Sequence, residues 1–102
     1  MTARLAAAAL AFTALCASAQ SERPARSLAA TCAGCHGTEG RSAAPELSAL
    51  AGLPKDDILD SLRGFRDGTR HSTVMQQIAK GYSDAELELI AAYFARQGRS
   101  AR

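Results

Sequence analysis

The stretch Cys32-Ala33-Gly34-Cys35-His36 has the C-x-x-C-H spacing of a covalent attachment site for c-type haem. On a helix, residues three and four apart lie on one side, so both thiols and the imidazole would project the same way. Each thiol can then bond one vinyl group of the same porphyrin, and His36 can supply an axial ligand to the iron. The stretch therefore predicts one haem c, bound covalently through Cys32 and Cys35.

The cysteine pair has two other possible uses. A thioredoxin-like redox dithiol should accompany a βαβ pattern, and the sequence shows none. A structural zinc site normally takes four Cys or His ligands in two spaced pairs, and there is no second pair. The sequence favours haem attachment over both.

Residues 1–19 have the pattern of a cleaved secretory signal peptide. Arg4 is followed by an uncharged apolar run over 5–15 and by the small-x-small cleavage site Ala17-Ser18-Ala19. The apolar run is too short to cross a hydrocarbon layer of about 30 Å as a helix. We expect residues 20–102 to form the mature domain in the periplasm, without stable membrane insertion.

The composition of this mature chain limits its partners. Removing 1–19 from the 102 residues leaves 83, with 11 of the 12 basic residues against 10 acidic ones. A nucleic-acid-binding protein would need a clearly basic face, so no nucleic acid is expected. Cys16 should leave with the signal segment; a lipid-modified Cys16 is the alternative, but the bulky Leu15 before it argues against that.

Helical periodicity and stop signals predict an all-α chain of about four helices in one small domain. Thr38 to Leu53 is expected to form a loop that wraps the cofactor on the His36 side. Phe65 belongs to the apolar stripe of the second helix, and Ser83 and Glu86 form a capping box for the last one. The expected helices run from Pro24 to His36, from about Pro54 to the stop at Gly68, from Val74 to Lys80, and from Asp84 to Gln97.

Met75 is the candidate for the second axial ligand. It is the only methionine of the mature chain, and it follows His36 by 39 residues. A lone methionine is usually core filler, but a haem site creates a demand for a soft sulfur ligand, and a methionine there favours electron transfer. His71 is the other possible ligand; its polar neighbours favour an exposed loop histidine instead.

Several motifs together resemble a class I bacterial cytochrome c. They are Cys32-Ala-Gly-Cys-His-Gly-Thr-x-Gly, Leu50-Ala-Gly, Leu62-x-x-Phe-x-x-Gly68, Ser72-Thr-x-Met75 and Ile78-Ala-x-Gly-Tyr-Ser-Asp84. The family most similar in these motifs is the cytochrome subunit of flavocytochrome c sulfide dehydrogenase, with related diheme cytochromes c. The resemblance implies crossed N- and C-terminal helices, haem held between His36 and Met75, and Tyr82 packed near the haem.

The chain departs from this family in two respects. One C-x-x-C-H stretch implies one haem, so a diheme relative would be matched by half its length. Related chains also carry a proline shortly before the Leu-Ala-Gly element, where a carbonyl orients the haem histidine. This chain has Pro45 and, nearer to Leu50, Ser48. The sequence leaves open which carbonyl accepts the ring N–H of His36.

The function expected from these features is one-electron transfer in the periplasm by a protein that is not an enzyme alone. The resemblance names a FAD-containing sulfide dehydrogenase subunit as a possible redox partner. A free shuttle to a terminal oxidase or another acceptor, and a haem-based ligand sensor, are the alternatives. Two surface features bear on partners: an apolar loop over 43–50, and Arg63, Arg66 and Arg70, which are expected to compensate the dipole of the second helix on a solvated face.

Overall fold

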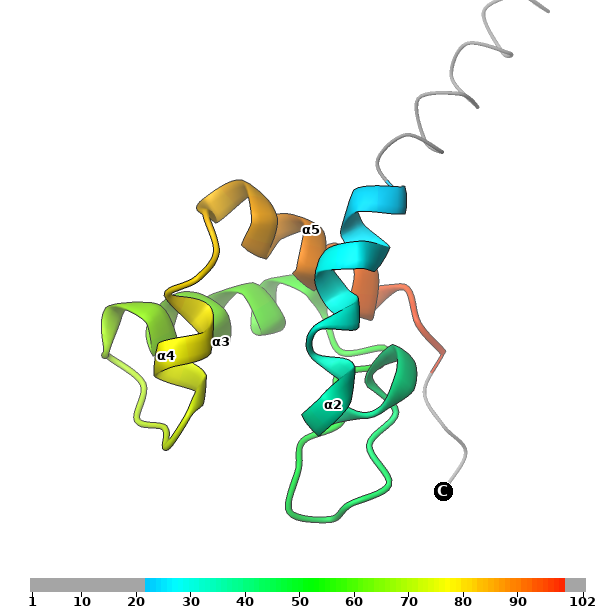
Figure 1. The fold of residues 1–102 in the computed structure, drawn as a ribbon, viewed down its shortest axis with the longest axis horizontal. Helices are drawn as coiled ribbons and strands as arrows, with labels where there is room; N and C mark the ends of the chain where they lie inside the picture. Colours follow the sequence, from blue (N-terminus) through cyan, green and yellow to red (C-terminus); the bar gives the residue numbers. More distant parts are fainter. Residues whose placement is uncertain (1–21, 99–102) are drawn as a thin grey trace, which may run out of the picture.

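Helices are the only regular secondary structure in residues 22–98, the residues that this computed structural model describes. They are a helical segment over 22–30, α2 (Ala33–His36), the 3₁₀ turn η1 (Thr38–Gly40), α3 (Lys55–Asp67), α4 (Met75–Ala79) and α5 (Asp84–Ala95) (Figure 1). The expected all-α class is confirmed. Between 22 and 98, no helix combines the length and apolar character that crossing a membrane requires. The expected signal peptide, 1–19, lies outside the described residues.

The sequence predicts one continuous helix from Pro24 to His36. In the structure this helix is interrupted by a turn at residues 31–32. The carbonyl of Leu28 accepts both the Thr31 N–H, at 3.3 Å, and the Thr31 hydroxyl, at 2.8 Å. The Cys32 N–H then bonds Ala29 rather than continuing the α-helical pattern. A threonine side chain that competes for backbone groups in this way commonly ends or bends a helix.

α3 begins and ends where its sequence signals predict. Asp56 and Asp57 occupy its first turn, where the helix dipole favours negative charge. Gly68 follows its last residue in the left-handed conformation (φ 78°, ψ 6°), which glycine adopts without a steric penalty. Its inner face buries Ile58 and Leu59 together with Leu62, and it packs against both α4 and α5.

α5 carries the predicted capping box. The Ser83 hydroxyl accepts the Glu86 N–H at 3.3 Å, and the Glu86 carboxylate accepts the Ser83 N–H at 2.7 Å. Its buried residues include the predicted stripe and also Tyr93, whose ring meets Phe94 edge-on at 5.3 Å between centroids. The buried set is Leu87, Ile90, Ala91, Tyr93 and Phe94.

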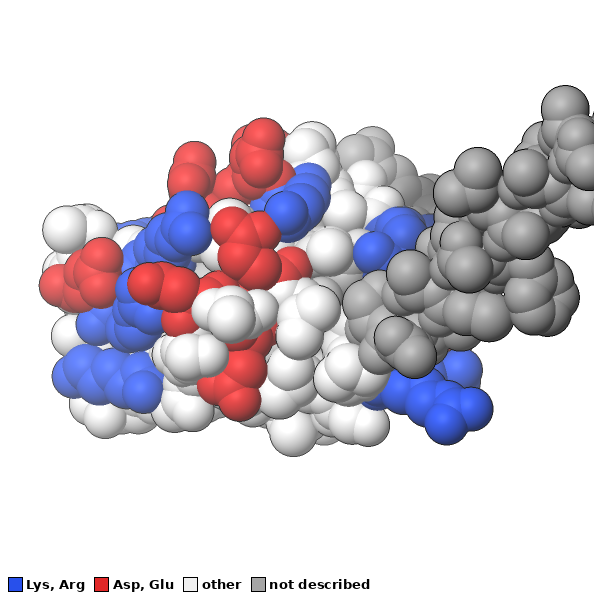
Figure 2. Space-filling view, turned by 90° about the horizontal axis from the view of Figure 1, so that it is seen from above, with Lys and Arg blue, Asp and Glu red and all other residues white. Residues whose placement is uncertain are grey.

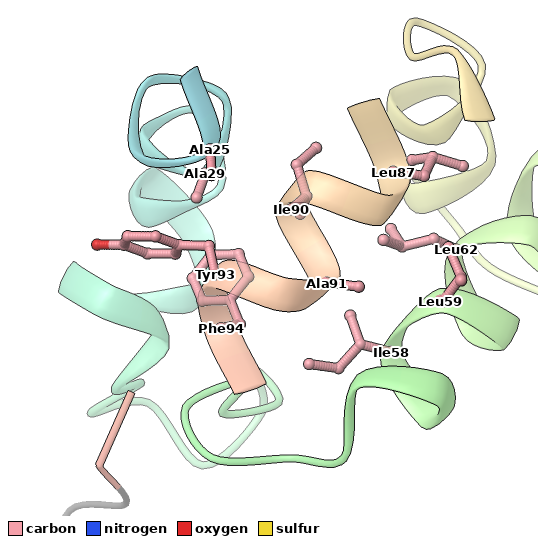
Figure 3. Close-up of a cluster of buried hydrophobic side chains, with 10 residues drawn as sticks. All are labelled: Ala25, Ala29, Ile58, Leu59, Leu62, Leu87, Ile90, Ala91, Tyr93 and Phe94. Atoms are coloured by element: carbon pink, nitrogen blue, oxygen red, sulfur yellow. The ribbon is translucent and has the colours of Figure 1, made fainter. Parts of the chain in front are cut away.

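The core is small and rich in alanine. Ala25 and Ala29 of the helical segment 22–30 lie beside Tyr93 and Phe94, so this segment packs closely on the C-terminal half of α5 (Figure 3). At the other end of α5, Leu87 faces the buried side chains of α3 (Figure 3). Phe94 and Leu87 are the largest side chains buried almost completely among the described residues.

Ion pairs join the outer faces of α3 and α5. Arg66 bonds Asp84 at 2.8 Å, Arg63 reaches Glu88 at 3.4 Å, and Lys55 reaches the same Glu88 at 2.5 Å. Acidic and basic side chains are interleaved on the face drawn in Figure 2, with no broad patch of one sign. Two of the arginines at the end of α3 therefore pair with a neighbouring helix rather than simply facing solvent.

Candidate functional site

The cysteines and histidine of the C-x-x-C-H stretch lie in one tight helical turn. Cys32 begins the turn with helical backbone angles (φ −81°, ψ −19°), and its carbonyl accepts the N–H groups of His36 at 2.9 Å and Cys35 at 3.3 Å. Cys32 is half-buried, Cys35 is exposed, and both thiols are free. Residues three and four apart lie on the same side of such a turn, so both thiols and the imidazole can reach the same porphyrin.

The ring of His36 is held by a single backbone group. Its Nδ1 atom lies 2.6 Å from the carbonyl oxygen of Ser48. A carbonyl can only accept, so Nδ1 must carry the proton and donate it. Nε2 then keeps its lone pair, which is the state in which imidazole binds a metal. The structure thus answers the question that the sequence left open, in favour of Ser48.

Gly40 anchors the loop that carries this carbonyl. Its own carbonyl accepts two N–H groups, from Leu50 at 2.8 Å and from Ala51 at 3.1 Å, and the Gly52 N–H bonds Phe94 of α5. Gly40 has a φ of +76°, and an added Cβ would lie 2.8 Å from the Phe94 ring. Only glycine provides both the backbone angle and the close approach. The loop is therefore pinned to the last helix.

Met75 lies in a different helix from the C-x-x-C-H turn, 39 residues beyond His36 in the chain. It is the first residue of α4, whose start is stabilised by the Ser72 hydroxyl accepting the Gln76 N–H at 2.9 Å. α4 packs on α3, and Met75 is half-buried against the core. The fold thereby brings a thioether from residue 75 to cavities that His36 also lines.

Two cavities of about 240 Å³ and 330 Å³ share four lining residues, Cys32, His36, Ser48 and Met75. The smaller opens between α2 and α4, and the larger runs along α3. Their walls are mainly apolar, as is usual for cofactor sites. Two thiols, an imidazole and a thioether around apolar walls fit a covalently attached haem. Further apolar residues of the walls are Leu47, Val74, Ile78, Leu50, Leu53, Ile58, Leu62, Phe65 and Ile90.

Tyr82 and His71 do not line either cavity. Tyr82 is half-buried against the core, and its hydroxyl lies 2.6 Å from that of Thr31, which does line the smaller cavity. Direct contact of Tyr82 with haem stays a prediction. His71 is exposed, as its polar neighbours suggested.

The thiol of Cys32 is poorly suited to redox catalysis. Burial raises its pKa, an effect that the Thr31 hydroxyl partly opposes and Cys35 adds to. Reactive dithiols instead have a lowered pKa, because the thiolate is the attacking species.

Within residues 22–98, no three His, Cys, Asp or Glu side chains come together as a metal-binding cluster.

Two features of the site do not follow from residue types. The Ser48 carbonyl is a backbone group: the sequence predicts that its loop lies on the His36 side, but not which carbonyl faces His36. Ser61 and Arg70 also line the larger cavity, and Arg70 is exposed at the same time, as the sequence predicts for a solvated arginine. Arg70 differs from Arg63 and Arg66 by its position two residues beyond Gly68, where the chain has already left the helix.

Similarity to known proteins shows the family of the chain. Residues 19–94 match the family described as cytochrome C oxidase, cbb3-type, subunit III. The chain is 45% identical over 67 residues to the cytochrome subunit of sulfide dehydrogenase from Chlorobaculum tepidum, which covers 66% of this chain and 60% of that protein. It is 37% identical over 70 residues to cytochrome c-554(548) from Halomonas halodenitrificans, covering 66% of this chain and 84% of that protein.

A third relative is longer. The thiosulfate dehydrogenase electron acceptor of Thiomonas intermedia is 41% identical over 69 residues, which make up 67% of this chain and 32% of that protein. The chain thus spans less than two thirds of the length of the sulfide dehydrogenase cytochrome subunit and of the thiosulfate dehydrogenase electron acceptor.

Proposed function

Since the chain belongs to the cytochrome c family, through the domain described as cytochrome c oxidase, cbb3-type, subunit III, we propose that it is a mono-haem electron-transfer protein. Cys32 and Cys35 would attach the haem covalently, and His36 and Met75 would be the ligands of its iron. The observation that carries this proposal is the convergence of these side chains, from two distant parts of the chain, on cavities with apolar walls.

When bound, the haem supplies a one-electron iron couple, and methionine ligation favours its use for electron transfer. The chain's own residues have three tasks. The Ser48 carbonyl keeps Nδ1 of His36 protonated and Nε2 available as a ligand. α4 carries Met75 to cavities that the C-x-x-C-H turn also lines, and the leucine and isoleucine side chains of the larger cavity exclude water. No substrate-binding residue is required for this role, so the chain is an electron carrier and not an enzyme by itself.

The partner that we propose is another redox protein, with a FAD-containing sulfide dehydrogenase subunit as the first to test. This choice of partner is supported by the similarity of the chain to a protein named the cytochrome subunit of sulfide dehydrogenase. Apolar side chains also surround the smaller cavity: Leu47 is 41% exposed, Val74 57% and Ile78 41%. An apolar rim suits stable docking, because a transient electrostatic encounter relies on charge.

Salt dependence of binding separates a subunit from a free shuttle. Affinity for the flavoprotein that changes little between about 0.01 and 0.15 M salt, where the screening length falls from about 30 to 8 Å, supports a subunit. A steep loss of affinity over that range would instead indicate a soluble shuttle to another acceptor. Leu47→Ser tests the apolar rim and should weaken a stable complex.

We further propose export to the periplasm through a signal peptide at 1–19. The basis is the sequence pattern of Arg4, the apolar run and the Ala17-Ser18-Ala19 site. N-terminal sequencing of the protein purified from the periplasm should start at Gln20. A protein retained in the cytoplasm with an intact N-terminus would contradict the proposal.

The absorption spectrum tests the proposed function itself. The protein should be produced in a host with a haem-attachment system and extracted with acid-acetone. Haem that stays with the protein, together with a ferric charge-transfer band typical of methionine–iron ligation, is the expected result. Haem lost on extraction would overturn covalent attachment, and absence of the band would overturn Met75 as ligand.

A further inference from the structure

The hydroxyl groups of Thr31 and Tyr82 lie 2.6 Å apart, although 51 positions separate the two residues in the chain. The Thr31 hydroxyl donates its single proton to the Leu28 carbonyl at 2.8 Å, since a carbonyl can only accept. The Tyr82 hydroxyl therefore donates to the Thr31 oxygen. The geometry thus gives a direction to both hydrogen bonds, and Thr31 is the acceptor for Tyr82.

This pair joins two parts of the chain that have no other polar contact with each other. Segment 22–37 carries the C-x-x-C-H turn, and segment 54–83 carries Met75. Within residues 22–98, the Thr31–Tyr82 pair is the only hydrogen bond or ion pair between these two segments. The other long-range polar contacts of segment 22–37 run to the loop that holds His36 and to the C-terminal end of α5.

Tyr82 is attached to the end of the helix that carries Met75. Its N–H bonds the carbonyl of Ala79, the last residue of α4, at 3.3 Å, and Ala79 is fully buried. On the other side of the pair, Thr31 directly precedes Cys32, and both line the smaller cavity together with Met75. The hydrogen bond therefore links the end of α4 to the start of the attachment turn, beside the cavity that opens between α2 and α4.

We propose that the Thr31–Tyr82 pair positions Met75 by holding α4 beside the haem attachment turn. The inference rests on the proposed function, in which Met75 is a ligand of the haem iron. A ligand from solution can take the place of Met75 only when its side chain withdraws, and α4 then moves away from the turn. The pair breaks in this movement, so its free energy stabilises the state in which Met75 is bound. Tyr82 acts through Thr31 and needs no contact with the haem.

Imidazole, added at a fixed pH to the ferric, haem-loaded protein, measures how readily Met75 is displaced, through loss of the methionine–iron charge-transfer band. Tyr82→Phe and Thr31→Val each remove one hydroxyl and nearly keep the size of the side chain. Each should raise the apparent affinity for imidazole about threefold, a modest change because Thr31 is exposed. Tyr93→Phe is the matched control, since the Tyr93 hydroxyl forms no hydrogen bond within residues 22–98; its affinity should equal that of wild type.

The double variant, Tyr82→Phe with Thr31→Val, should bind imidazole no more tightly than either single variant, because both changes remove the same hydrogen bond. Thr31→Ser keeps the acceptor and should behave as wild type. If Thr31→Val does not retain haem, the comparison of Tyr82→Phe with Tyr93→Phe decides.

Three results would overturn the role of the pair while the wild-type spectrum still supports the electron carrier. They are an unchanged imidazole affinity in Tyr82→Phe, an equal rise in Tyr93→Phe, and additive effects in the double variant. A wild-type protein without covalent haem or without the charge-transfer band would instead overturn the proposed function.

Discussion

The Nδ1 atom of His36 lies 2.6 Å from the carbonyl oxygen of Ser48, a residue 12 positions along the chain. This contact determines which ring nitrogen can bind a metal, and it depends on how the loop between them is anchored. Gly40 provides the anchor through its two carbonyl contacts and its approach to Phe94. The orientation of the proposed ligand is therefore linked to the packing of α5.

Gly40→Ala should break this link. The added methyl group would meet Phe94 and the backbone of Ala51, and a φ of +76° is unfavourable for alanine. Overpacking and backbone strain together should cost about 2 kcal/mol or more of unfolding free energy. Chemical denaturation of the haem-loaded protein measures this loss. Gly98→Ala is the control, since its Cβ would meet only Arg41 at 3.9 Å; equal effects in both variants would contradict the anchoring role.

Met75→Ala should leave the haem attached but open its sixth coordination position. The reduction potential should fall, and the ferrous protein should bind carbon monoxide readily, because no thioether competes for the iron. Redox titration and carbon monoxide difference spectra measure the two effects. His71→Ala serves as the control, because His71 does not line either cavity. Carbon monoxide binding in His71→Ala but not in Met75→Ala would show that the ligand assignment is wrong.

Folding should depend on the attached haem. The protein core relies on small alanines and two fully buried large side chains, whereas Leu50, Leu53 and Met75 line the cavities and are only half-buried. Cys32→Ser with Cys35→Ser should remove the cofactor and with it cooperative unfolding, because a chain this small is marginally stable on its own core. Thermal circular dichroism measures this. Wild-type chain made without a haem-attachment system should behave the same way; a cooperatively melting double variant would contradict the prediction.

The ion pairs between α3 and α5 predict a specific pH dependence. The hydrogen bond and charge of Arg66 lower the pKa of Asp84, and Lys55 similarly lowers the pKa of Glu88. An acid with a lowered pKa in the folded state stabilises it above the unfolded-state pKa, and this contribution is lost as the pH falls through the folded-state pKa. The effect should be small, because both carboxylates are exposed to solvent.

Asp84→Asn should therefore have a lower Tm than wild type at neutral pH, and the gap should narrow as the pH is lowered through the range where carboxylates titrate. High salt should also narrow it. Melting curves across that pH range measure the gap. Asp60→Asn is the control, since Asp60 is exposed on α3 and makes no ion pair within residues 22–98. A gap that is constant with pH would rule out the ion pair as its source.

The chemistry of the site could be predicted from sequence because it depends on residue types at short spacings. C-x-x-C-H, a single methionine and the capping box before α5 are local patterns, and helices form from local hydrogen bonds. The break at Thr31 escaped prediction, because it depends on one hydroxyl competing for the Leu28 carbonyl. Helix bounds elsewhere followed from Gly68 and Ser83, whose effects are equally local.

A helical fold and the C-x-x-C-H pattern of a haem attachment site can be predicted from residue types at short spacings. Folding was needed to show which carbonyl lies against His36, that Arg70 stacks on Phe65 while Arg66 pairs with α5, and that the Tyr82 hydroxyl lies beside that of Thr31. These contacts join residues through loop geometry and helix packing, which short spacings do not specify. A backbone carbonyl has no residue type to mark it, and identical arginine side chains differ only in what the folded chain places beside them.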